Sequence, residues 1–203
     1  MPSNRDKAGR VKGLRLKPMV TVRRYSPNQS ARSAPISLIV LHSTESHNRP
    51  GNSDLEAIGG LFANPSFDAS SHIGVDADGH SARYVNDEAK AWTVGNLNSA
   101  SLNIEQIGFA AQGRRSWRAQ KHLLRETARW IARWSIRHGI PIRKARLSGS
   151  GQVLQSGVTT HDYCSKHGAG TSHWDPGDYP MGYVLWLARG FKAALILTRQ
   201  HKN

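Results

Sequence analysis

The sequence predicts an α/β fold in which a central mixed β-sheet is flanked by helices. A continuous apolar run at residues 36–41 has the length and β-branching of a buried strand. Shorter strand patterns separated by turn residues follow it, and residues 118–137 and 180–197 carry helical apolar stripes. Because the chain has 203 residues and is 38% hydrophobic, we expect a single domain with one core.

The N-terminal region is expected to be a basic arm outside this domain. Residues 1–34 are rich in Lys, Arg, Pro and Ser and show little periodicity. Residues 19–22, Met-Val-Thr-Val, are the exception and predict a short edge strand or arm packed on the domain. We therefore assign residues 1–34 to a largely flexible arm and residues 35–203 to the folded domain.

The elements between the first buried strand and the last helix follow from turn and cap residues. After a turn at 48–53, Ser53 or Asp54 can cap a helix that ends at Asn64. Residues 70–75 and 81–85 predict a hairpin around Asp-Ala-Asp-Gly, and residues 91–94 and 102–109 are further strand candidates. The helix at 118–137 should end at Gly139, and the helix at 180–197 closes the domain.

The composition restricts the partners and the cellular compartment. A formal charge of +14, from 28 Lys and Arg against 14 Asp and Glu, predicts attraction to polyanions such as anionic cell-wall polymers. The basic residues lack an interleaved aromatic pattern, so nucleic acid is not favoured. The N-terminus has no apolar stretch typical of a signal peptide, and no run reaches the roughly 18 apolar residues of a membrane span. We expect a monomer made in the cytoplasm.

Residues that can hold a metal are concentrated at 160–177 and at the end of the first buried strand. His42 follows that strand, and His161 and Asp175 lie in the later segment. Two imidazoles and one carboxylate match a catalytic Zn²⁺ site that keeps one position open for water. His167 and Cys164 remain alternative ligands, and Cys164 can equally be a buried or a reactive thiol.

Two further residues suit hydrolysis at such a metal. Glu105 lies in an otherwise apolar strand, where an ionisable group is costly unless a charge or metal compensates it, which makes it the candidate general base. His173, two residues before Asp175, can support the oxyanion of a tetrahedral intermediate. His72 and Trp92 are candidates for the wall of the substrate site, although Trp92 can equally be a core residue.

Six short motifs, in order, resemble the type-2 N-acetylmuramoyl-L-alanine amidases. They are Leu-His-Ser-Thr-Glu from residue 41, Ser-Ser-His-Ile-Gly-Val-Asp-Ala-Asp-Gly from 70, Glu-Ala-Lys-Ala-Trp from 88, Ser-Leu-Asn-Ile-Glu-Gln-Ile-Gly from 101, Thr-His-Asp from 160 and Trp-Asp-Pro-Gly from 174. The resemblance covers about residues 35–197. It implies zinc ligands at His42, His161 and Asp175 and a general base at Glu105.

The sequence departs from the family pattern at three places. His173 stands where the family has a lysine that stabilises the transition state. The segment from His161 to Asp175 is several residues longer than usual, and Ser71 replaces a tyrosine found in some members. The longer segment is what keeps His167 and Cys164 open as ligands.

The resemblance implies hydrolysis of the amide between N-acetylmuramic acid and L-alanine in bacterial peptidoglycan. With no visible signal peptide, we expect a bacteriolytic, antimicrobial phage endolysin that acts on the wall after release through a holin. Alternatives are a cytosolic muropeptide-recycling amidase, a noncatalytic peptidoglycan-binding protein and, on charge alone, a basic nucleic-acid-binding protein with a structural metal.

Overall fold

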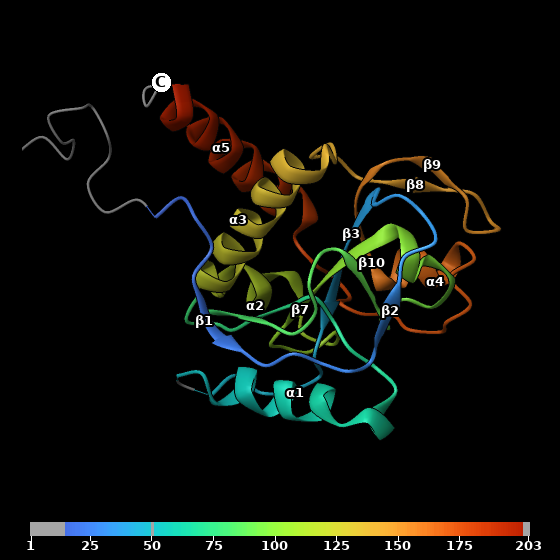
Figure 1. Cartoon of the computed structure of the whole chain (residues 1–203). Coiled ribbons are helices and arrows are strands. Elements are labelled where there is room, and N and C mark those ends of the chain that lie inside the picture. Colours follow the sequence, from blue (N-terminus) through green and yellow to red (C-terminus); the bar gives the residue numbers. More distant parts are fainter. Residues whose placement is uncertain (1–14, 50, 201–203) are drawn as a thin grey trace, which may run out of the picture.

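Six strands form the central sheet, in the order β1-β5-β4-β7-β3-β10, and the paired strands β3 and β10 lie side by side in it (Figure 1). The computed structural model describes residues 15–49 and 51–200. Its elements are β1 (Val20–Arg23), β2 (Gln29–Ala31), β3 (Leu38–Ser43), α1 (Ser53–Ala63), η1 (Pro65–Phe67), β4 (Ile73–Val75), β5 (Ser81–Arg83), β6 (Ala89–Ala91), η2 (Gly95–Ala100), β7 (Ser101–Gln106), α2 (Arg114–Ala119), α3 (Lys121–His138), β8 (Arg146–Leu147), β9 (Val153–Gln155), β10 (Gly157–Thr160), α4 (His161–Lys166) and α5 (Met181–Gln200).

The sheet is mixed, which confirms the predicted fold class. Strand β3 lies between β7 and β10 and is parallel to both. Strand β4 runs parallel to β7 but antiparallel to β5, and β1 is parallel to β5 at the edge. All six residues of β3 are buried, as its continuous apolar run predicts for a strand covered on both faces.

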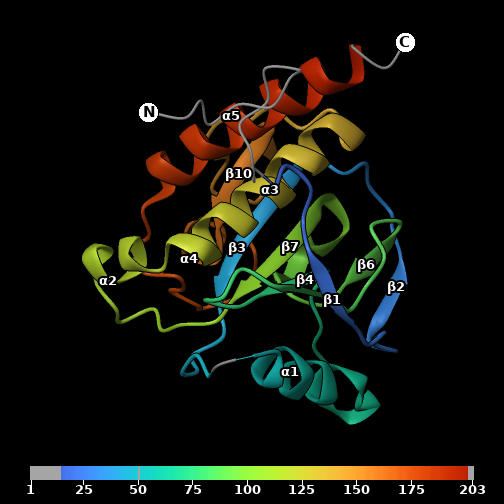
Figure 2. The ribbon, with the colours of Figure 1, turned by 90° about the vertical axis from the view of Figure 1, so that its left-hand side faces the viewer.

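Helices cover both faces of the sheet (Figure 2). On one face, α3 and α5 pack together over a core that includes Ile39 and Leu41 of β3. Leu38 and Val40 belong to a different apolar cluster, which also contains Cys164 of α4. Because successive side chains of a strand point to opposite faces, His42 shares the face of Leu38 and Val40. The candidate site is thus on the side of the sheet away from α3 and α5.

Several element boundaries differ from the expected ones for local reasons. The expected helix at 118–137 is present as α3, which is preceded by the short α2 and ends at Gly139 with a φ of 70°. Helix α1 begins at Ser53, so the two expected cap residues, Ser53 and Asp54, lie in its first turn, and its N-cap is Asn52. The carboxylate of Asp54 instead accepts hydrogen bonds from the backbone and side-chain nitrogens of Arg49.

The segment at residues 15–34 contributes two strands. Strand β1 pairs with β5, as expected for an edge strand at residues 19–22, whereas β2 was not expected and pairs with β6. The Arg32 guanidinium donates to the carbonyl oxygen of Ser99 at 2.7 Å. The domain boundary at residue 34 stays a prediction, and residues 1–14 of the expected arm lie outside the described residues.

The last helix is longer than expected and strongly apolar. Helix α5 reaches Gln200, and by length and composition it is a helix that could cross a membrane, although the sequence patterns predict no span. It packs along α3 and buries Val184, Leu185, Ala188 and Phe191, while 28% of its apolar window is buried in the structure.

Candidate metal centre

Three predicted ligands, His42, His161 and Asp175, meet beyond the carboxyl ends of β3 and β10. These strands are parallel, with Thr160 paired with Leu41, so His161 begins α4 beside His42. The Nδ1 atoms of the two histidines are 3.1 Å apart. Asp175 places Oδ2 at 3.5 Å from the His42 Nδ1 and Oδ1 at 3.2 Å from the His161 Nδ1. All three residues are buried.

Backbone N–H groups of α4 and β3 hold Asp175 in place. Its carbonyl oxygen accepts from the Asp162 N–H at 2.9 Å, and its Oδ2 accepts from the Ser43 N–H at 3.2 Å. Two residues later, Gly177 has a φ of +63°, and a Cβ there would lie 2.0 Å from the carbonyl oxygen of Ala110. The glycine of the Asp-Pro-Gly motif is therefore required by backbone conformation and by close packing.

The second nitrogen of each histidine is engaged away from the cluster. The His42 Nε2 lies 3.0 Å from the Asn103 Oδ1, and the His161 Nε2 lies 3.2 Å from the Thr171 Oγ1. With both Nε2 atoms as donors, neutral rings would direct two Nδ1 lone pairs at each other and at the Asp175 carboxylate, which is unfavourable without a proton or a metal ion between them. Two imidazole nitrogens and a carboxylate within 4.8 Å of one another form a donor set that fits Zn²⁺.

The charges of the cluster are strongly coupled. Burial disfavours the Asp175 carboxylate, but hydrogen bonds with His161 and His42 outweigh burial and hold its pKa well below the usual range. Burial opposes protonation of His42 as well, yet the nearby carboxylates of Glu105 and Asp175 raise its pKa. Burial lowers the pKa of His161. In the metal-free protein, His42 is thus the ligand that takes up a proton, which a bound metal ion has to displace.

Glu105 lies on β7 directly beside His42, its register partner on β3. The pKa of this carboxyl is about 7 because burial raises it, with the positive charge of His42 opposing the rise and the carboxylates of Asp175 and Glu45 adding to it. A carboxyl group with a pKa near neutrality, next to a candidate metal site, is suited to proton transfer.

His173 lies at the open side of the cluster. Its side chain is 64% exposed, and its Nδ1 is 3.7 Å from the Asp175 Oδ1. Its ring stacks on His161, with centroids 4.3 Å apart. The position is accessible to a substrate, and the oxyanion role expected of His173 stays a prediction.

His72 and Trp92 lie away from the three ligands. His72 is fully buried, and its Nδ1 accepts from the Asn103 backbone N–H at 3.1 Å. Burial and the neighbouring Arg32 lower its pKa to about 3, so its ring is neutral. Trp92 is half-buried and donates from its indole N–H to the Ser30 hydroxyl at 3.0 Å. Their expected contacts with substrate stay predictions, and in the structure His72 supports Asn103.

The two alternative ligands are not part of the cluster. Among the residues that the structure describes, the metal-capable group at this site consists of His42, His161 and Asp175. His167 stacks on the Tyr163 ring at 3.9 Å between centroids. Cys164 is buried, and burial raises the pKa of its thiol to about 12.

Asn103 and Thr171 are positioning residues that sequence reasoning missed. Asn103 precedes Glu105 by two residues, so the polar-apolar-polar pattern of Asn103-Ile104-Glu105 placed both on one face and was the available signal. Thr171 lies in the unusually long segment between His161 and Asp175. That segment forms α4 and a loop whose Thr171 contacts His161, which gives the extra length a structural use.

Comparison with known proteins identifies relatives of the whole domain. The profile of the family described as N-acetylmuramoyl-L-alanine amidase matches residues 32–178. A search of curated proteins gave no match.

Solved structures share the fold at low sequence identity. The Staphylococcus aureus hydrolase AmiA, solved with its ligand, has a TM-score of 0.65 and 19% identity over 90% of this chain and 87% of that one. An AmpD derivative has a TM-score of 0.58 and 19% identity over 84% and 93%. The Ph2119 endolysin from the Thermus scotoductus MAT2119 bacteriophage Ph2119 has a TM-score of 0.56 and 17% identity over 82% and 97%.

Proposed function

The chain belongs to the N-acetylmuramoyl-L-alanine amidase family, whose substrate is peptidoglycan, and from this premise we propose that it is a zinc-dependent, wall-lysing enzyme. The observation that carries the proposal is the convergence of His42, His161 and Asp175. The scissile bond is the amide between the lactyl group of N-acetylmuramic acid and the L-alanine of the stem peptide.

The roles of the protein residues follow from their positions. His42, His161 and Asp175 would hold Zn²⁺, which when bound acidifies a water molecule and polarises a carbonyl group. Glu105 accepts the proton of the attacking water and returns one to the leaving amine, which its pKa of about 7 permits in both directions. His173, at the exposed side, donates to the oxyanion of the tetrahedral intermediate. Asn103 and Thr171 hold the two imidazole rings in place.

Substitution of Glu105 tests the assignment. We expect Glu105→Ala to abolish wall digestion while the protein still binds zinc, because Glu105 is not in the ligand group. Glu88→Ala, at a side chain 68% exposed, is the matched control and should retain full activity. A fully active Glu105→Ala enzyme would remove Glu105 from the mechanism. A protein without bound zinc that leaves walls intact would indicate a noncatalytic peptidoglycan-binding protein.

A phage endolysin is the setting we propose for this activity. The chain shares its fold with the Ph2119 endolysin, and its charge of +14 suits an anionic wall. Release through a holin would bring such a cytoplasmic protein to its substrate. Mass spectrometry of digested walls tests the bond: new amino groups of L-alanine should appear without new reducing sugars, whereas reducing sugars would indicate glycan cleavage. Activity on soluble muropeptides but not on intact walls would favour a recycling amidase.

A further inference from the structure

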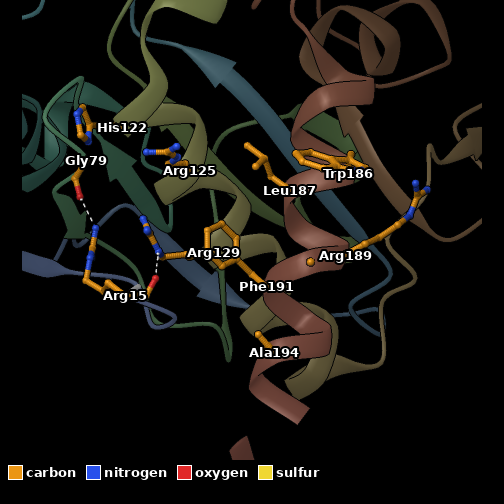
Figure 3. Close-up of a pocket in the computed structure, with 11 residues that line it drawn as sticks. Arg15, Gly79, His122, Arg125, Arg129, Trp186, Leu187, Arg189, Phe191 and Ala194 are labelled. Carbon is orange, nitrogen blue, oxygen red and sulfur yellow. Dashed lines mark hydrogen bonds between the residues drawn. The ribbon is translucent and has the colours of Figure 1, made fainter. Parts of the chain in front are cut away.

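A second surface feature lies on the opposite side of the sheet from the metal site. It is a cleft of about 770 Å³ between α3 and α5, and Arg15 lies at its border beside Gly79 and Arg129 (Figure 3). Its walls combine three arginines, Arg15, Arg125 and Arg129, with the apolar side chains Trp186, Leu187 and Phe191. We call this surface the α3–α5 cleft.

The cationic side of the cleft carries more positive charge than it can neutralise. Arg15 and Arg129 share one carboxylate, that of the buried Glu126, at 2.8 and 3.2 Å. Arg125 is exposed beside them, whereas the guanidinium of Arg189 points away from the cleft and donates to the Ile142 carbonyl oxygen (Figure 3). Burial lowers the pKa of Arg129, and the nearby charge of Arg15 lowers it further. A bound anion would relieve this repulsion.

The apolar side of the cleft continues onto the outer surface of α5. Trp186 is 64% exposed and Ile196 is 40% exposed, and both lie on the outermost helix of this face (Figure 2). Helix α5 contains Arg189, Lys192 and Arg199 but no acidic residue. An apolar helix face with tryptophan, on a helix whose charged residues are all basic, is the pattern of a helix that lies in a membrane interface.

We propose that the α3–α5 cleft and the outer face of α5 form a docking site for the surface of a bilayer that contains anionic phospholipid. The exposed Arg125 and the partly exposed Arg15 bind lipid phosphate groups, and Trp186 with its apolar neighbours inserts among the acyl chains. An anionic wall polymer would account for the arginines but not for the apolar face of α5, because such a polymer offers no acyl chains to that face. The metal site is on the other side of the sheet, so docking leaves it accessible.

Vesicle co-sedimentation tests the proposal with the full chain. We expect binding to vesicles of phosphatidylcholine with phosphatidylglycerol and none to phosphatidylcholine alone. Arg125→Gln should weaken binding about fivefold, the contribution of one cation near an anionic membrane surface. Trp186→Gln should weaken it by about tenfold or more, because a large apolar side chain no longer inserts. Both residues are exposed, so both variants should fold normally.

Matched controls lie on the β8–β9 hairpin. Leu154 is 57% exposed and Arg146 is exposed, so Leu154→Gln and Arg146→Gln change the same kinds of residue elsewhere. The proposal is overturned if anionic vesicles do not bind, or if the cleft variants bind as the controls do. It is also overturned if Trp186→Gln leaves vesicle binding unchanged but abolishes dimerisation or binding to a wall polymer, since the surface would then serve a second copy of the chain or that polymer. Hydrolysis of a soluble muropeptide should be unchanged in all four variants, which separates this test from that of the amidase activity.

Discussion

Glu105 is expected to destabilise the metal-free protein near neutral pH, and Glu105→Gln should relieve this cost. The pKa of Glu105 is raised to about 7 by burial, whereas an exposed glutamate titrates near 4.5. A group that holds its proton more tightly in the folded state reduces stability as pH rises from the unfolded to the folded pKa. The loss therefore begins above about pH 4.5 and is complete above about pH 7.

The magnitude follows from the shift. Each pKa unit corresponds to about 1.4 kcal/mol, so the full shift amounts to about 3 kcal/mol. Because water reaches part of the Glu105 side chain, we reduce this to about 2 kcal/mol. At pH 8, Glu105→Gln should exceed the wild type in free energy of unfolding by about 2 kcal/mol, and at pH 4 the two proteins should be similar.

Urea unfolding in the presence of a chelator, at several pH values, measures the difference. Glu88→Gln, at an exposed side chain, is the control and should follow the wild type throughout. Equal stability of Glu105→Gln and the wild type at pH 8 would refute the reasoning, since it would mean that Glu105 loses little solvation on folding. If the expected gain is found together with loss of wall digestion, the site trades stability for function.

Three further substitutions test the geometry around the metal site. Asn103→Ala should weaken zinc binding about 10- to 100-fold in a chelator competition, because the His42 ring loses its acceptor; unchanged affinity would exclude a positioning role. His173→Ala should lower kcat on the order of 100-fold, whereas His173→Lys should retain most activity because lysine can also donate to the oxyanion. Equal activity of the two variants would contradict an oxyanion role for His173. Gly177→Ala should lower the free energy of unfolding by more than about 1 kcal/mol and weaken zinc binding. The φ of +63° disfavours any residue with a Cβ, and the added Cβ would also clash with the Ala110 carbonyl oxygen. Thermal unfolding measures the first effect and zinc titration the second.

Local patterns in the sequence were sufficient for the elements whose burial is periodic or continuous. The apolar run ending at His42, the hairpin around residues 76–79 and the helix ending at Gly139 are all present. Each is specified by side chains close in sequence, through strand alternation, turn residues or a left-handed cap. The same holds for the Asp-Pro-Gly turn that carries Asp175.

Residue types and motifs along the chain indicated which side chains could hold a metal, but only the folded arrangement brings three of them together. Strand β10 is only four residues long, and its pairing with β3 is what places His161 beside His42 across 119 positions of sequence. Neither that pairing nor the contact between His42 and Asn103 leaves a local periodic signal, since both depend on strands distant in the chain. The separation of His167 and Cys164 from the cluster has the same cause, because the orientation of α4 is set by packing against the sheet.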